Sequence, residues 1–505
     1  MIPEAKRINW LGGFCTGEGF EIKSDFGENE TACAERISRG LKGTGHIPLT
    51  LTKTDSEKTE YCLRVHQEGV EILASANGIF PAMSSLQNII EDGKIPLCDI
   101  RDYARFEHRG YMQDDARHFQ GAGAAVEILE IMFRFKMNVF HWHISDDQGF
   151  RLNLPGYERL ARQATGRLSS NVGGYTKNRP DNVPYSAVYS RDEMETVLKA
   201  ARERGIRVIP EIDMPGHFSA ILSAYPEFTC DGVKIDVPGR YGVLENTLCL
   251  GKKEAREFAK QLALDVARYF KADTVHIGFD EIKTGKMCTC PDCLAEAERR
   301  GLKSPEELLP LFREEVKEFL SDHGIGVIAW DDENSLSGPA DDITLMHWRP
   351  ESNLRAAKRA HNGQKTICCD FYHHYADYPY CMTPLKKTYL RDPVFPGVRD
   401  DSSIVGVETP LWAEFVRSAD KREMNAFYRI AAVSQNAWNR PAERPAYEDF
   451  KKELTEREAY YFGKRLDVPE SILNPPFAVR LVRLKKCLYE DADLEVKLWK
   501  AKEEA

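Results

Sequence analysis

Eight short runs rich in β-branched and aromatic residues alternate with helical segments between residues 110 and 412, and this alternation constrains the fold more than any other feature. Strands that alternate with helices are typical of repeated βα units, whose strands lie parallel in one sheet. Eight such units predict a closed (β/α)8 barrel, a TIM barrel. The predicted strands lie within residues 110–115, 138–145, 207–213, 274–281, 326–331, 343–348, 365–371 and 403–412.

The segments on either side of the barrel have different patterns. Residues 1–105 combine strand-like runs, such as 61–65, with a helix candidate at 79–90, which predicts a small α+β domain. Residues 441–505 are charged, with amphipathic helix patterns at 447–462 and 477–502 that we expect to pack against the barrel. We therefore expect an N-terminal α+β domain at 1–105, the barrel at 106–440 and a C-terminal helical segment at 441–505.

Composition argues against some classes of partner. The chain has 505 residues, of which 69 are basic and 79 acidic, and the net charge of −10 argues against binding to nucleic acid or to a membrane surface. No run of apolar residues is long enough to predict a transmembrane helix. The first residues contain no apolar signal core, and thirteen scattered cysteines, an odd number, fit a reducing compartment. We expect a cytoplasmic protein.

One cysteine cluster, formed by Cys288, Cys290 and Cys293, has a spacing that could hold zinc. A structural zinc site needs four ligands, however, and no CxxC or HxxxH motif follows nearby. We therefore expect reduced thiols in a loop, and we expect the protein to use neither a metal nor an organic cofactor.

Polar and aromatic residues gather where the predicted strands end, which is where the active site of such a barrel lies. Any one of them could be a solvated loop residue or a core aromatic, but eight such ends together are hard to explain by structure alone. Aromatic rings cover the apolar faces of sugars, and carboxylates and arginine bind hydroxyl groups, so this composition favours a carbohydrate ligand. The strand-end residues include Asp114, Arg117, His143, Asp146, Glu211, Asp213, His217, Asp280, Glu281, Trp330, Trp348, Tyr375, Asp377, Trp412 and Glu414.

Asp280 and Glu281 form the most informative pair, because they follow directly on a predicted buried strand that ends in glycine. Adjacent carboxylates repel each other, which separates their pKa values and can leave one of them protonated near neutral pH. A protonated acid beside an ionised one suits cleavage of a glycosidic bond. The alternative is a capped strand end with two solvated acids.

Four long motifs resemble those of family 20 glycoside hydrolases, the β-N-acetylhexosaminidases, and the resemblance runs from about residue 60 to 440. The motifs, which occur in the family's order, are residues 112–119 (MQDDARHF), 136–151 (KMNVFHWHISDDQGFR), 209–217 (IPEIDMPGH) and 276–281 (HIGFDE). The N-terminal unit resembles the small α+β domain that precedes the barrel in that family.

The resemblance implies an exo-acting, retaining hydrolase for terminal β-linked N-acetylglucosamine or N-acetylgalactosamine, in which the 2-acetamido group of the substrate is the nucleophile. Glu281 then matches the general acid and base, and Asp280 the carboxylate that holds the acetamido N–H. Tyr375 matches the residue that bonds the acetamido oxygen. Asp146 and His217 match a relay behind Glu281, and Asp213 resembles a supporting acid.

The remaining matches concern the sugar ring. Arg117 matches a clamp on O3 and O4, Glu414 an acceptor at O4 and O6, and Asp377 an O6 contact, while Trp330, Trp348 and Trp412 resemble the pocket walls. The chain departs from the family pattern at Phe150, Phe279 and Ala376, which leaves substrate preference less defined than reaction type.

Several alternatives remain open from the sequence. One is a same-family enzyme for a 6-sulfated N-acetylglucosamine or a lacto-N-biose unit. Another is a sugar-binding barrel without catalysis, against which the presence of Asp280, Glu281, Tyr375 and Arg117 argues. The chitinases of the other substrate-assisted family need a DxxDxDxE series, which this chain lacks. A homodimer with the C-terminal helices in its interface is compatible with the sequence.

Overall fold

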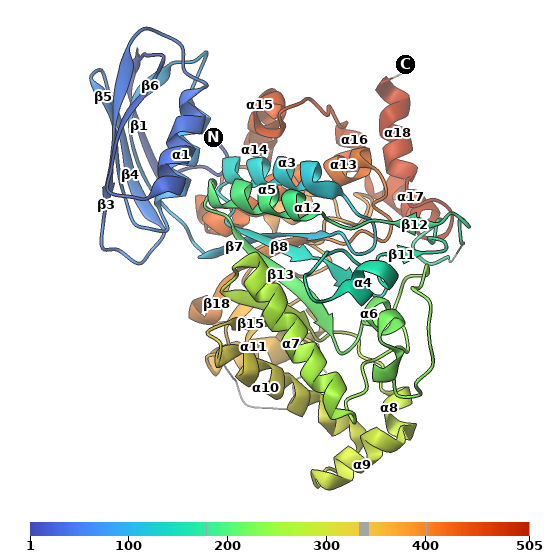
Figure 1. Ribbon diagram of the computed structural model, residues 1–505. Helices are drawn as coiled ribbons and strands as arrows, with labels where there is room; N and C mark the ends of the chain where they lie inside the picture. Colours follow the sequence, from blue (N-terminus) through green and yellow to red (C-terminus); the bar gives the residue numbers. More distant parts are fainter. Residues whose placement is uncertain (178, 333–342, 400, 504–505) are drawn as a thin grey trace.

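A computed structural model describes residues 1–177, 179–332, 343–399 and 401–503. Its centre is a closed barrel of eight parallel strands, which confirms the predicted (β/α)8 fold (Figure 1). Each predicted run overlaps one barrel strand. Around the barrel the strands follow one another in chain order. They are β7 (His108–Asp114), β8 (Val139–His143), β13 (Arg207–Met214), β14 (Thr274–Gly278), β15 (Gly326–Trp330), β16 (Thr344–His347), β17 (Thr366–Cys368) and β18 (Ile404–Leu411).

The barrel strands are buried on both faces, which is why they read as continuous β-rich runs and not as alternating ones. Charged side chains also fill the interior. Glu211 lies 2.8 Å from His276 and 3.1 Å from His141, and Glu408 lies 2.7 Å from His141 and 2.8 Å from His108. Burial lowers the pKa of His141, but Glu408 and Glu211 outweigh that effect and raise it to about 9. Paired charges thus form a fixed layer beneath the strand ends.

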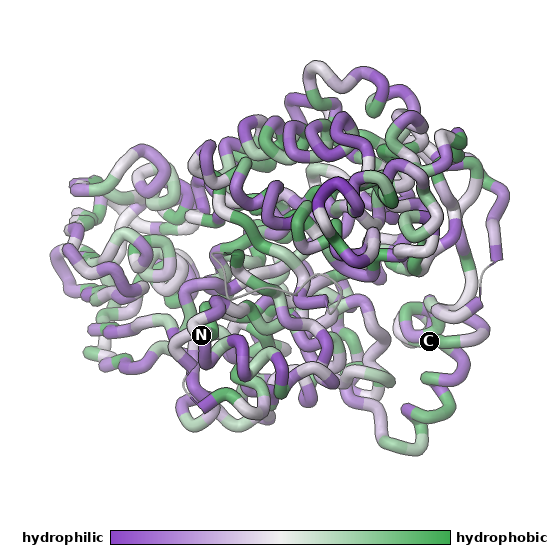
Figure 2. The backbone as a smooth tube through the Cα atoms, turned by 90° about the horizontal axis from the view of Figure 1, so that it is seen from below, coloured by the Kyte–Doolittle hydropathy of each residue, from purple (hydrophilic) through white to green (hydrophobic). Residues whose placement is uncertain are grey.

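Helices cover the outside of the barrel, and residues of opposite hydropathy alternate along them, as Figure 2 shows. Helix α5 begins at a capping box in which Ser190 accepts a hydrogen bond from the Glu193 backbone, a stabilising start for a helix. The outer helices are α3 (Gly121–Arg134), α5 (Arg191–Arg202), α7 (Lys253–Phe270), α10 (Leu308–Ser321), α11 (Asn353–His361), α12 (Leu385–Leu390) and α13 (Ala419–Trp438).

Several strand-to-helix connections contain short elements of their own, which enlarge the rim of the barrel. They are β9 (Ser145–Asp146), β10 (Gly149–Phe150), α4 (Glu158–Gln163), β11 (Gly166–Arg167), β12 (Tyr185–Ser186), α6 (Ser219–Ala224), α8 (Gly285–Thr289) and α9 (Pro291–Arg299). Short 3-10 turns occur at Pro226–Phe228, Pro305–Glu307, Pro350–Ser352, Asp401–Ser403 and Pro441–Glu443.

The N-terminal unit is a six-stranded sheet with two helices, as predicted for a small α+β domain, and α1 lies on the side of the sheet that faces the barrel (Figure 1). A buried cluster joins it to the barrel: Asp102 accepts from Lys136 at 2.7 Å and from Trp438 at 2.9 Å. Its elements are β1 (Arg7–Cys15), β2 (Gly19–Ser24), α1 (Glu28–Ser38), β3 (His46–Lys53), β4 (Glu60–His66), β5 (Gly69–Ala74), α2 (Ile79–Ile89) and β6 (Ile95–Tyr103). The division into units at residues 105 and 440 stays a prediction.

The C-terminal helices are present but shorter than predicted. The first predicted helix breaks at Arg457, which places the next residue, Glu458, where it binds the Tyr428 hydroxyl and the Asp467 backbone. The segments are α14 (Tyr447–Glu456), α15 (Glu458–Phe462), α16 (Glu470–Leu473), α17 (Phe477–Tyr489) and α18 (Leu494–Glu503). Within the described ranges, every helix is too short or too polar to cross a membrane.

Candidate active site

A cavity of about 800 Å³ opens at the C-terminal ends of the barrel strands. Two of the predicted site residues, Asp146 and Asp213, are buried behind its wall, and the other ten line it. Residues far apart in the sequence thus meet at one end of the barrel. The ten lining residues are Arg117, His217, Asp280, Glu281, Trp330, Trp348, Tyr375, Asp377, Trp412 and Glu414.

The turn after β14 aims the two adjacent carboxylates into this cavity. Gly278 has φ +68°, and a Cβ at this position would lie 1.8 Å from the Asp213 carboxylate, so only glycine fits. Phe279 and Glu281 also have positive φ, +76° and +50°, which is costly for residues with a side chain. The Phe279 amide donates to Asp213 at 3.2 Å, so Asp213 holds the turn in place.

The unusual Phe279 identified in the sequence thus occupies a backbone conformation that favours glycine. Its ring is fully buried and stacks on Phe312 with 6.1 Å between centroids. Phe279→Gly relieves about 1–3 kcal/mol of strain but removes packing worth about 3–5 kcal/mol. We expect a net loss of about 1–3 kcal/mol, measured as a lower urea midpoint. Phe279→Leu, which keeps most of the packing and all of the strain, is the control; a Gly variant more stable than wild type would contradict this balance.

His217 connects the carboxylate pair to charges behind the wall. Its Nε2 lies 3.7 Å from Glu281 and 3.9 Å from Asp280, and its Nδ1 lies 3.2 Å from Asp146. Asp146 in turn accepts from the Arg117 guanidinium at 2.6 Å. Burial lowers the pKa of His217, but Asp146 and its other acidic neighbours raise it well above the usual range, so the imidazolium persists near neutral pH.

The pKa values of the two carboxylates are separated, as expected for an adjacent pair. Burial, together with Glu281, raises the pKa of Asp280 to about 7. Burial also acts to raise the pKa of Glu281, but His217 and Arg349 outweigh it, and the pKa lies below its usual value. Of the two carboxyls, Asp280 therefore has the higher pKa and holds a shared proton more strongly than Glu281, which the resemblance designates as the acid.

Aromatic rings form the walls beside the pair. Trp330 and Trp412 pack with 5.6 Å between ring centroids, and Trp412 lies 6.2 Å from Tyr375. The Trp330 indole N–H donates to Glu211 at 2.9 Å, so the charged layer in the barrel fixes this ring. Such walls suit the apolar face or methyl group of a ligand.

Polar groups also line the cavity. The Arg117 guanidinium stacks 4.9 Å from the Trp412 ring, with Glu414 4.0 Å away. Burial raises the pKa of Asp377, and Glu414 raises it further. The Oδ1 atoms of Asp280 and Asp377 and the indole nitrogen of Trp348 are buried without a hydrogen-bond partner. Buried polar atoms of this kind are normally satisfied, so these three are ready to bind a ligand.

The sequence alone did not identify two further parts of the site. Arg349 lies 3.7 Å from Glu281 and 3.6 Å from Asp332, and Asp332 accepts from the Glu281 amide at 2.8 Å. Asp332 lies two residues beyond the end of β15. Helix α17 supplies outer lining residues, namely Phe477, Arg480, Leu481, Leu484 and Leu488. The sequence carried no signal for this contact, because the exposure of Phe477 and Leu481 is visible only in the fold.

Donor atoms of His217, Asp280 and Glu281 lie close enough together to suggest a metal site. His217 already pairs with these two carboxylates and with Asp146, so the arrangement fits a hydrogen-bonded network.

Comparisons with known proteins agree with this geometry. The β-hexosaminidase of Porphyromonas gingivalis is 30% identical over 421 residues, 78% of this chain and 52% of the relative, so the chain spans about half of that protein. The β-hexosaminidase of Akkermansia muciniphila is 29% identical, over 72% of this chain and 75% of the relative. A crystal structure of a β-N-acetylhexosaminidase superposes with a TM-score of 0.76 at 25% identity, covering 94% of this chain and 98% of the other. The model of the glycosyl hydrolase family 20 catalytic domain matches residues 106–441, and the chain belongs to this family.

Proposed function

We propose that the protein is an exo-acting, retaining β-N-acetylhexosaminidase that releases terminal N-acetylglucosamine or N-acetylgalactosamine. The observation that carries this proposal is the Asp280–Glu281 pair at the wall of an aromatic-lined cavity, with the pKa of Asp280 raised to about 7 and that of Glu281 lowered. Membership of the family supports the same reaction.

In the proposed reaction the acetamido oxygen of the substrate attacks C1 while the glycosidic C1–O bond breaks. Glu281 donates a proton to the departing oxygen, and Asp280 accepts the acetamido N–H and stabilises the positive charge of the oxazolinium ion. Water then attacks C1 from the face that the leaving group left, and Glu281 takes its proton. Two inversions at C1 give retention of configuration.

This order of reaction steps requires the shared proton to move from Asp280 to Glu281 when substrate binds. The acetamido N–H hydrogen-bonds to ionised Asp280 and so lowers its pKa. The substrate also displaces water from Glu281, whose side chain is 30% exposed, and desolvation raises the pKa of that carboxyl. Both effects favour transfer of the proton to Glu281, which can then act as the general acid.

The polar side of the cavity is proposed to bind the ring hydroxyls. Arg117 is held by Asp114 at 3.1 Å and Asp146 at 2.6 Å, so its guanidinium is positioned before substrate arrives. Glu414 and Asp377 are proposed to accept from O4 and O6.

Release of 4-nitrophenol from its β-N-acetylglucosaminide, β-N-acetylgalactosaminide and β-glucoside tests the proposal. We expect turnover of the two N-acetylated substrates and at least about 10³-fold less of the glucoside, because the glucoside has no internal nucleophile. Equal turnover of the glucoside would contradict substrate assistance. No turnover of any of the three, with turnover of a lacto-N-bioside, would favour the disaccharide enzyme. Binding of substrate without any turnover would favour a sugar-binding barrel.

We also propose a cytoplasmic location, supported by thirteen cysteines that form no disulfide in the described structure. A homodimer stays a prediction from the sequence.

A further inference from the structure

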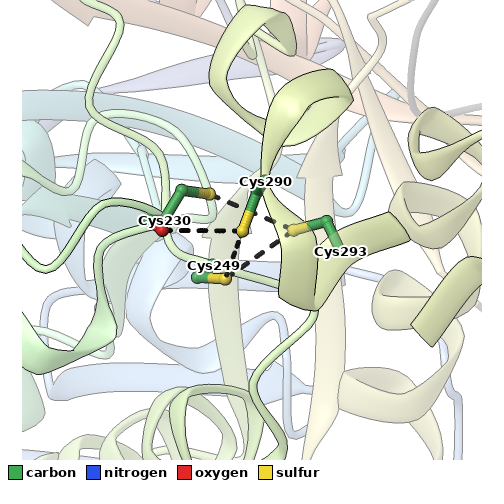
Figure 3. A group of neighbouring side chains, drawn as sticks. All are labelled: Cys230, Cys249, Cys290 and Cys293. Atoms are coloured by element: carbon green, nitrogen blue, oxygen red, sulfur yellow. Dashed lines mark hydrogen bonds between the residues drawn. The ribbon is translucent and has the colours of Figure 1, made fainter. Parts of the chain in front are cut away.

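Four cysteines from three segments of the chain meet, as Figure 3 shows. Cys290 precedes α9 and Cys293 lies in its first turn, so these two form the CxxC pair. Cys230 lies in the loop after β13, and Cys249 lies shortly before α7. All except Cys230, which is partly exposed, are buried.

The sulfur atoms of these cysteines already have the spacing of a tetrahedral metal site. Cys249 Sγ lies 3.7 Å from the sulfurs of both Cys290 and Cys293, and Cys230 Sγ lies 4.0 Å from that of Cys293. All four sulfurs lie within 4.8 Å of one another. Four thiolates at about 2.3 Å from a zinc ion are about 3.8 Å apart, so an ion fits with small adjustments. Disulfide bonds require about 2.05 Å, far shorter than these separations.

The surroundings favour ionised sulfur. Cys290 and Cys293 lie at the N-terminus of α9, where the helix dipole stabilises thiolates. This feature is independent of the distances between the sulfurs.

We propose that Cys230, Cys249, Cys290 and Cys293 bind one structural zinc ion. Four thiolates in a closed tetrahedral set leave no open position for substrate, so the ion stabilises the fold and takes no part in chemistry. This revises the expectation of metal-free loop thiols. The two missing ligands come before the CxxC pair in the sequence, Cys230 by 60 residues, and the sequence had been searched only after the pair.

The position of the site gives the ion a definite structural role. Cys249 belongs to the segment that leaves β13, where Leu248 donates to the Pro215 carbonyl at 2.9 Å. The CxxC pair belongs to the segment that follows Glu281, and Thr247 joins the two segments by donating to the Lys283 carbonyl at 2.9 Å. Zinc would therefore tie together the two connections that carry His217 and the Asp280–Glu281 pair.

The test is metal analysis of the full-length protein purified without chelators from zinc-supplemented medium. We expect about one zinc per chain in wild type and in the control Cys288→Ser, whose sulfur binds Glu306 and lies outside the cluster. Cys249→Ser and Cys293→Ser should retain less than about a tenth of that amount and unfold at lower temperature, since metal binding is coupled to folding.

A second measurement covers the case in which those variants fail to fold. Wild type stripped of metal by a chelator is titrated with Co²⁺, and the expected result is the strong visible absorption of a tetrahedral cobalt thiolate, displaced by one equivalent of zinc. Iron in place of zinc, equal metal content in Cys293→Ser and wild type, or cysteine pairs found as disulfides by intact-mass analysis would each overturn the proposal. None of these readouts depends on hydrolysis, so the result is independent of the proposed function.

Discussion

Asp280→Asn is expected to make the protein more stable while it lowers turnover by about 10²–10³-fold. The loss of turnover follows from the proposed role, because asparagine has no negative charge to offer the oxazolinium ion. The gain in stability follows from the pKa of Asp280, which burial raises from 3.8 to about 7. The folded protein keeps its proton in a pH range where the unfolded chain has lost it, so wild-type stability falls as pH rises from about 4 to 7.

The asparagine variant lacks this penalty. Its advantage over wild type in free energy of unfolding should therefore grow by about 2 kcal/mol between pH 5.5 and pH 8, and urea midpoints at the two pH values measure it. Asp213→Asn is the comparison for stability: Asp213 is buried with a raised pKa of its own and should share the stability effect. Its bond to the Phe279 amide makes it unsuitable as a control for turnover. An Asp280→Asn protein whose advantage shrinks at pH 8 would contradict the assignment of the proton.

The barrel could be predicted from the sequence because each strand is local and buried on both faces. Val139 to His143, for example, are all buried, and the run reads as a strand without knowledge of its neighbours. The location of the site followed from the same rule, since the ends of parallel strands meet at one end of a barrel. This is why Asp146, from β9 after the second barrel strand, and Glu414, after the eighth, could be placed together.

The features that escaped prediction depend on contacts between distant segments. Cys230 meets Cys293 only because the connections after β13 and β14 run side by side, and Phe477 reaches the cavity only because α17 packs over the rim. The higher pKa of Asp280 is another feature that depends on distant segments. Adjacent acids predicted a separation of pKa values. Which of the two values is the higher depends on Arg349 and His217, whose positions beside Glu281 the sequence does not show.

Glu281→Gln should lower turnover unequally for two substrates that differ in their leaving group. A sugar hydroxyl is a poor leaving group that needs a proton, so turnover of N,N′-diacetylchitobiose should fall by about 10⁴-fold, near the upper range of general acid catalysis. 4-Nitrophenol leaves as an anion, so its release in the first turnover should fall by about 10²-fold or less. Single-turnover measurements on both substrates isolate this step from the later attack of water.

The control for this prediction is Glu245→Gln, an exposed acid in the segment that leads to Cys249, which should behave as wild type on both substrates. Equal losses on the two substrates would place Glu281 in binding or positioning instead of proton donation.

The unequal loss has a further consequence for pH dependence. If Glu281 receives the shared proton only with substrate bound, kcat/KM of wild type should decline above pH 7 as the unliganded Asp280 ionises and the pair loses its single proton. In Glu281→Gln, first-turnover release of 4-nitrophenol should lose that decline, because no acid step remains for the proton to serve.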